Sequence, residues 1–158
     1  MGFRTAPTHF AGAETQMYIV STTLEDYPEG WIVETEIYRE KDLREPYLLV
    51  QNGTLYFYFF ELGTNPIAFE PSALLRMSRI EFGKWTSPKQ WGQEGECTWQ
   101  FNIHKGSAYA ISFAGTKGVT SFGQVNLYLN RSDDGVTWNP VDPEKTVLYK
   151  NGGISEVS

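Results

Sequence analysis

The sequence NRSDDGVTWNPV, residues 130–141, has the composition of a tight turn between two strands. Asp133, Asp134 and Gly135 suit such a turn, because aspartate side chains accept backbone N–H hydrogen bonds and glycine adopts the left-handed conformation. Asp-Gly alone would turn the chain, so Thr137 and Trp138, directly after the turn, need an explanation of their own.

Trp138 belongs to a repeat of about 50 residues. Three tryptophans are 54 and 53 residues apart, and two further pairs share the 53-residue offset: Trp31, Trp85 and Trp138; Gly53 and Gly106; Tyr56 and Tyr109. A period of this length, with several short strands in each unit, is typical of β-propeller blades. A large ring at the same place in every unit is expected to fill the space between neighbouring blades.

The segments between the turns are predicted to be strands. They are short, rich in β-branched and aromatic residues, and bounded by turn residues: 16–22, 31–37, 45–50, 54–62, 98–103, 107–113 and 124–132. Residues 51–54 (QNGT) and 104–107 (HKGS) place a glycine where a tight hairpin needs positive φ. The apolar spacing of residues 70–80 fits a helix or a strand.

We therefore predict an all-β chain that forms one partial propeller domain. It is expected to contain about three blades, each a four-stranded antiparallel sheet, over residues 8–42, 43–95 and 96–150. Residues 152–158 would begin a fourth unit. Three blades alone would leave open edges and aromatic faces, which favour self-association. The chain is therefore expected to be part of a longer wheel, because GISEVS stops where a strand should begin, or else to combine with a second copy.

The turn before Trp138 resembles a sequence motif that is typical of one protein family. RSDDGVTW resembles the Asp box, Ser/Thr-x-Asp-x-Gly-x-Thr-Trp, through Asp133, Gly135, Thr137 and Trp138, with Arg131 departing at the first position. Residues 21–31 (STTLEDYPEGW) resemble a degenerate copy of the same turn. The Asp box is characteristic of sialidase-like propellers, so the chain resembles about half of a six-bladed wheel of that superfamily. In that family the box is a structural device, away from the site.

The resemblance also implies candidate site residues. FRTAPTHF, with Arg4 and His9, is similar to the Phe/Tyr-Arg-Ile-Pro motif of sialidases, whose arginine binds the substrate carboxylate, although an extra residue separates Arg4 from Pro7. A guanidinium is suited to bidentate recognition of a carboxylate. Glu156 would correspond to the glutamate that activates a tyrosine nucleophile, and that tyrosine would lie beyond Ser158. The alternative for Arg4 is bonding to carbonyls at a strand end.

Two further segments place polar or aromatic residues at the start of expected inner strands. DLREP, residues 42–46, offers Arg44 and Glu45 to a pocket, or to an ion pair at the strand entry. GECTW offers Glu96 and Trp99, the second as a stacking surface for a sugar ring or as a core residue. Glycoside hydrolysis needs two carboxylates, and Glu45, Glu96 and Glu156 could supply two of them. Glu45 and Glu156 are the predicted catalytic residues. Arg4, His9, Arg44, Glu96 and Trp99 are predicted to bind substrate.

Composition narrows the classes of partner. The net charge of −6, from 13 basic and 19 acidic residues, disfavours nucleic acid. No apolar run approaches the roughly 20 residues of a membrane span. Cys97 is the single cysteine, which rules out an internal disulfide, and no Cys/His spacing suggests a metal site. No cofactor is expected, and the polar N-terminal residues favour a cytoplasmic location.

Two functions remain open from the sequence. The first is a glycoside hydrolase of the sialidase type that acts on a carbohydrate ligand. The second is a non-catalytic propeller that binds sugar or protein, because propellers support many functions. Convergence of the candidate residues in one cleft would favour the first.

Overall fold

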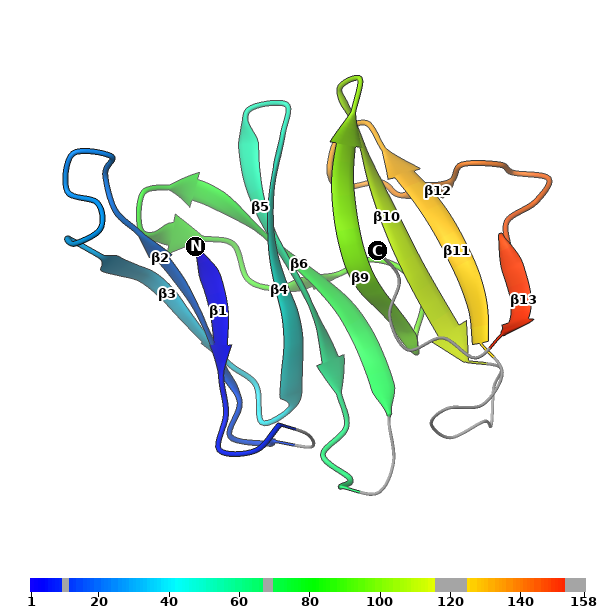
Figure 1. Ribbon diagram of the computed structural model, residues 1–158, viewed down its shortest axis with the longest axis horizontal. Helices are drawn as coiled ribbons and strands as arrows, with labels where there is room; N and C mark the ends of the chain where they lie inside the picture. Colours follow the sequence, from blue (N-terminus) through cyan, green and yellow to red (C-terminus); the bar gives the residue numbers. More distant parts are fainter. Residues whose placement is uncertain (10–11, 67–69, 116–124, 153–158) are drawn as a thin grey trace.

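The computed structural model describes residues 1–9, 12–66, 70–115 and 125–152, and every regular element in these residues is a β-strand. The strands form three antiparallel sheets that follow one another along the chain (Figure 1). The all-β prediction is therefore confirmed. Residues 55–61 and 108–113, which carry the most apolar segments of the repeat, lie in strands rather than helices.

The first sheet has three strands in the order β1-β2-β3: Gly2–Thr5, Gln16–Ser21 and Ile32–Tyr38. The second sheet has the order β4-β5-β6-β7, with β8 also paired to β6: Asp42–Gln51, Thr54–Leu62, Pro71–Glu81, Lys84–Trp85 and Lys89–Gln90. The third sheet has the order β9-β10-β11-β12, with β13 also paired to β11: Glu96–His104, Ser107–Gly115, Val125–Ser132, Asn139–Pro140 and Tyr149–Gly152.

The hairpins β4–β5 and β9–β10 turn at the two predicted positions. Asn52 and Gly53 have φ of 49° and 76°, and Lys105 and Gly106 have φ of 49° and 82°. Two successive positive φ values are the mark of the two-residue turn whose twist matches that of the flanking strands. This turn fixes the register, so that Gln51 pairs with Thr54 and His104 pairs with Ser107.

The expectation of four strands per sheet is only partly met. In the second and third sheets the outermost strand is divided into two short pieces, which both pair with the same neighbour. Proline explains the division, since it lacks the N–H that a ladder needs. Pro88 separates β7 from β8, and Pro143 lies between β12 and β13. The first sheet has one strand fewer than four.

The missing strand of the first sheet can be identified from the repeat. Strands β2, β6 and β11 each lead into a tryptophan corner, and each pairs with the strand that follows the corner. The strands β1, β5 and β10 that precede them are therefore equivalent. The second and third sheets each have one more strand, β4 and β9, on the far side of β5 and β10. In the described residues, nothing pairs with β1 in that position.

Two apolar clusters join neighbouring sheets. One packs the first sheet on the second: Met17, Ile19, Ile37, Leu43, Phe57, Phe59, Leu75 and Met77. The other packs the second sheet on the third and is dominated by rings, among them Tyr58, Trp91 and Phe101. Strand β4 contacts both β1 and β9. The strand that comes first along the chain in each sheet therefore lies next to the corresponding strand of the neighbouring sheet.

The quoted turn is held by Asp134. Its Oδ1 accepts the backbone N–H groups of Val136 and Thr137, both at 2.7 Å, and the hydroxyl of Ser132 at 3.0 Å. Ser132 in turn accepts the N–H of Gly135, which has φ of 72°. Both Asp133 and Asp134 were expected to accept N–H groups within the turn, and among the described hydrogen bonds Asp134 alone does so. Asp133 instead accepts hydrogen bonds from Ser107 and Arg131.

The same corner rests on the preceding sheet. Tyr56 and Tyr58 donate their hydroxyls to the carbonyl oxygens of Asp134 and Gly135, at 3.0 and 2.6 Å. A Cβ on Gly135 would come within 2.5 Å of the Tyr56 ring, so glycine is required there by space as well as by φ. The corner is therefore a docking element between sheets.

The three tryptophans occupy related places with different neighbours. Trp138 packs against Tyr58 and Phe101, whose ring centroids lie 5.9 and 5.6 Å away, at the junction of the second and third sheets. Trp85 packs against the cluster between the first and second sheets and donates its Nε1–H to Glu34 of β3 at 3.1 Å. Trp31 lies on the first sheet and is 42% exposed. The half-buried indoles of Trp85 and Trp138 thus each face the sheet that precedes their own.

Candidate functional site

The candidate site is built around a fully buried carboxylate, Asp42, at the start of β4. Arg4 of β1 donates from Nη2 to Asp42 Oδ1 at 2.8 Å. Arg44, two residues further along β4 and therefore on the same face of the strand, donates to Oδ2 from Nη2 at 2.9 Å and from Nε at 3.1 Å. Two guanidinium groups from two sheets thus converge on one carboxylate.

Backbone carbonyls complete the arrangement. Arg4 Nε donates to the carbonyl of Leu43 at 2.8 Å, and both arginines donate to the carbonyl of His9. His9 therefore joins the cluster through its backbone, while the residue as a whole is exposed. These bonds fix the orientation of both guanidinium planes, because a guanidinium donates in a rigid fork.

One guanidinium nitrogen remains available for a ligand. Within the described part of the chain, Nη1 of Arg4 makes no hydrogen bond, and the Arg4 side chain keeps 19% of its surface exposed. Arg44 is more enclosed, at 10%. An anionic group that reaches this cluster would meet Arg4 first.

Glu45 follows directly on β4, in an irregular part of the strand. The register between β4 and β5 shifts between Arg44 and Tyr47, and Glu45 has φ of 50°, a left-handed conformation that is uncommon for a residue with a side chain. The shift interrupts the alternation of the strand and leaves Glu45 exposed.

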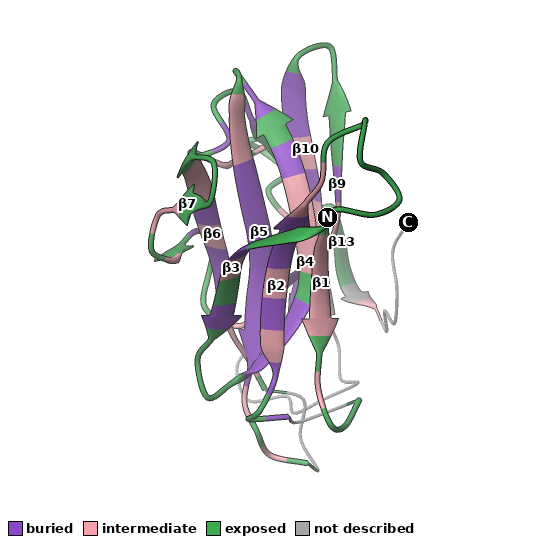
Figure 2. Cartoon of the chain, turned by 90° about the vertical axis from the view of Figure 1, so that its left-hand side faces the viewer, coloured by how far each residue is buried: buried purple, intermediate pink, exposed green. Residues whose placement is uncertain are grey.

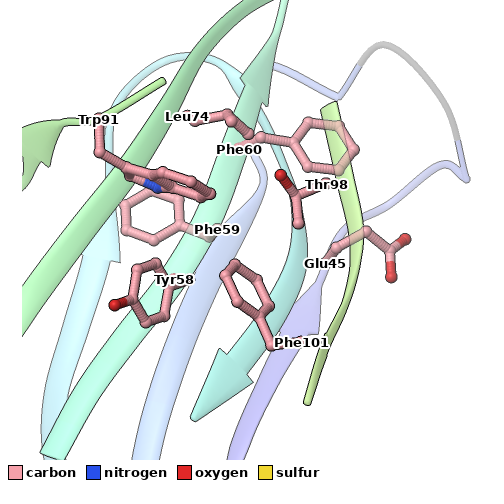
Figure 3. Close-up of a pocket in the computed structure, with 8 residues that line it drawn as sticks. All are labelled: Glu45, Tyr58, Phe59, Phe60, Leu74, Trp91, Thr98 and Phe101. Carbon is pink, nitrogen blue, oxygen red and sulfur yellow. The ribbon is translucent and has the colours of Figure 1, made fainter. Parts of the chain in front are cut away.

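A narrow crevice, with no room for a water molecule, lies beside Glu45 between the second and third sheets. Most of its lining is apolar: Tyr58, Phe59, Phe60, Leu74, Trp91 and Phe101, with Thr98 as the polar residue besides Glu45. Figure 3 shows the rings gathered on one side and the carboxylate of Glu45 directed away from them. Glu45 thus stands at the edge of the crevice.

Glu96, a predicted substrate-binding residue, is held by hydrogen bonds inside the protein. It is buried, with 3% of its surface exposed, and it accepts the N–H of Gln93 at 2.8 Å and the hydroxyl of Ser112. A Cβ on Gly92 would lie 2.9 Å from Glu96 Oε2, so the loop passes very close to the carboxylate. These bonds hold the loop before β9 against the third sheet.

Trp99 is packed between aromatic rings. It stacks on Phe113 with centroids 5.7 Å apart and meets Phe60 edge-on at 6.0 Å. One face of the indole is therefore covered by protein, and sugar stacking on Trp99 stays a prediction. Glu156, the other predicted catalytic residue, lies outside the described residues.

The thiol of Cys97 shows how near the charged residues of β4 and β9 are to one another. Burial raises the pKa of Cys97, and the charges of Glu96 and Glu45 raise it further, whereas Arg44 opposes them. A thiol with a raised pKa stays protonated and unreactive near neutral pH. The starts of β4 and β9 thus bring Arg44, Glu45 and Glu96 to one region, and β1 adds Arg4.

Sequence reasoning missed Asp42, the centre of the cluster. Its signal was the spacing to Arg44, since residues two apart on a strand share a face. In the described residues, no group of three or more His, Cys, Asp or Glu is placed to hold a metal ion, and no helix is long and apolar enough to cross a membrane. No family model, curated protein or solved structure matches the chain.

Proposed function

We propose that the three sheets are successive blades of a sialidase-like β-propeller. Three observations support this arrangement. The second and third sheets share one strand order, their first strands β4 and β9 contact each other, and Trp85 and Trp138 each face the preceding sheet. In a propeller, the first strand of each blade lines the axis and neighbouring blades pack face to face.

We further propose that the protein binds a carbohydrate that carries a carboxylate. The observation that carries this proposal is the convergence of Arg4 and Arg44 on Asp42, with Nη1 of Arg4 left for an outside acceptor. Asp42 holds the guanidinium groups in place before any ligand arrives, which lowers the entropic cost of binding. Charge-assisted bonds from arginine are the natural means of recognising a carboxylate.

Hydrolysis is proposed for the same site, with Glu45 as one of the two carboxylates. Glu45 is exposed, follows Arg44 and borders the crevice. Its partner in a glycoside hydrolase would be a second acidic group several ångström away. The sequence offers Glu156 as the candidate for this second carboxylate.

A non-catalytic carbohydrate-binding propeller is the second candidate, and Glu96 favours it. Of the predicted pocket acids, Glu96 is buried and bonded to Gln93 and Ser112, so it is not placed to act on a sugar. Binding by Arg4 would persist without any second carboxylate.

Calorimetric titration of the chain with a sialic acid, a uronic acid and their methyl esters tests the binding proposal. We expect the free acids to bind and the esters to bind at least tenfold more weakly, because the ester removes the charge. Arg4→Gln should abolish the difference between acid and ester. Arg131→Gln, in an exposed ion pair at the β11–β12 corner, is the matched control and should leave it intact. Equal binding of acid and ester would contradict the proposal.

Hydrolysis of aryl glycosides separates the two candidates. Turnover that disappears in Glu45→Gln, with binding of the free acid retained, would establish the hydrolase. Binding without turnover in the parent chain would establish the non-catalytic candidate.

A further inference from the structure

The first sheet presents a face that its counterparts bury. Its large exposed apolar side chains are found at the corner between β2 and β3 and on β3 itself: Leu24, Tyr27 and Trp31 in the corner, and Ile32, Val33 and Tyr38 on the strand. Figure 2, which looks onto this side of the molecule, shows exposed and intermediate stretches along β1 and β3. Scattered apolar residues are normal on a surface, but a group of this size, gathered at one corner and the strand after it, marks an interaction site.

Trp31 indicates what kind of surface belongs there. The equivalent indoles Trp85 and Trp138 each pack on the sheet that precedes their own, whereas the described chain has no sheet before the first. Trp31 is left with Tyr27, whose ring meets it edge-on at 6.2 Å, and with a hydrogen bond from Nε1 to the carbonyl of Pro28. The surface that fits this face is therefore another sheet of the same repeat.

The third sheet presents the matching surface. Ala108 and Ala110 of β10 are buried against the second sheet, so alternation along the strand directs Tyr109 and Ile111 to the opposite face. Tyr109 occupies the repeat position of Tyr56, two residues after its hairpin turn. Tyr56 donates to the corner of the next sheet, and Tyr109 is placed to do the same for a corner such as residues 22–30.

We infer that two copies of this chain associate, with the third sheet of each packed on the first sheet of the other. This contact would repeat the packing between sheets within one chain, where a turn that carries a tryptophan packs on a sheet face that carries a tyrosine. Because each copy has one face of each kind, two such contacts can close a ring of six sheets rather than an open chain. The inference rests on the proposed blade arrangement.

Sedimentation equilibrium of the chain and two variants tests the inference. We expect a dimer for the parent chain. Trp31→Asp, on the first sheet, and Tyr109→Asp, on the third, should each lower the association constant at least a hundredfold. Phe82→Asp is the matched control, since Phe82 is an exposed apolar residue in the turn between β6 and β7. It should remain dimeric. Circular dichroism and the thermal midpoint of each variant verify that it is folded.

Mixing the two variants determines which faces meet. A copy with Trp31→Asp still has an intact third sheet, and a copy with Tyr109→Asp still has an intact first sheet. Their equimolar mixture should therefore form a one-to-one pair, although each is monomeric alone. A monomeric parent chain, a dimer that survives Trp31→Asp, or folded variants that do not complement each other would each overturn the inference. Failure of the blade arrangement would appear separately, as unchanged stability in Trp85 and Trp138 variants.

Discussion

The hydroxyl of Tyr58 donates to the carbonyl oxygen of Gly135 at 2.6 Å, across 77 residues of sequence. The Tyr58 side chain is fully buried, and burial raises the pKa of its hydroxyl, so it remains a donor at any ordinary pH. This bond joins the middle of the second sheet to the corner of the third. It shows that the corner is part of the packing between sheets.

Removing this hydroxyl should destabilise the protein although the ring remains. Tyr58→Phe leaves the Gly135 carbonyl without its partner in a buried place, which costs about 1–2 kcal/mol. Urea unfolding measures the free energy of unfolding. Tyr18→Phe is the control, because that hydroxyl bonds only to side chains near the surface. A Tyr58 variant that loses no more than the Tyr18 variant would argue against docking through this bond.

The three tryptophans should differ in their contribution to stability. Trp138→Ala and Trp85→Ala remove half-buried indoles from junctions between sheets, and each should cost about 2–4 kcal/mol. Trp31→Ala, measured on the monomer, should cost less than about 1 kcal/mol, because this indole has no sheet to pack against. Chemical unfolding of the three variants gives the comparison. Equal losses at all three positions would mean that Trp31 is already packed within one copy.

The corner should make the protein sensitive to acid. Hydrogen bonds from the backbone N–H groups of Thr137 and Val136 lower the pKa of Asp134 from its ordinary 3.8 to about 2. A depressed pKa means that the carboxylate stabilises the fold above about pH 4 and that this stabilisation disappears as pH falls towards 2. The pKa of Asp133 is lowered as well, first by the Ser107 hydroxyl.

Thermal midpoints between pH 2 and pH 5 measure this effect. The midpoint should fall with pH in the parent chain and fall less steeply in Asp134→Asn, with the remaining slope coming in part from Asp133. Parallel profiles for the two proteins would show that Asp134 does not hold the turn.

The Arg4–Asp42–Arg44 cluster should be the most sensitive ionic group of the fold. Asp42→Ala leaves two guanidinium groups near the protein interior without their carboxylate, and breaking a buried pair in this way costs about 3–5 kcal/mol. Glu81→Ala removes an exposed pair with Lys84 and should cost less than about 1 kcal/mol. If Asp42→Ala unfolds at the same urea concentration as Glu81→Ala, the cluster is accessible to water and its ion pairs contribute little to the free energy of unfolding.

Local features of the fold were predictable because a single physical requirement decides each of them. The hairpins at Gly53 and Gly106 follow from the need for positive φ, and the strands follow from their β-branched and aromatic residues. The register of the corner was harder, since Asp133 and Asp134 are adjacent and chemically identical. Only the fold reveals that Ser107 and Arg131 donate hydrogen bonds to Asp133, which leaves Asp134 to accept the N–H groups of the turn.

The candidate site was predicted in part. Arg4 was identified by its suitability for a carboxylate and Arg44 by its place at a strand entry, and the fold brings both onto one cluster. Asp42 was missed because its role depends on β1 lying beside β4, a contact that no local pattern encodes. The hydrogen bonds that Glu96 accepts from Ser112 and the N–H of Gln93 could not be predicted, because they depend on how the loop before β9 packs on β10.

A crystal structure of the chain tests the central claim most directly, because that claim concerns how three sheets are related in space. We predict that one rotation superposes the third sheet on the second, with Trp138 on Trp85, and that the same rotation carries the second sheet onto the first, with Trp85 on Trp31. Sheets that share no such axis, or a Trp85 or Trp138 that does not pack on the sheet preceding its own, would contradict it.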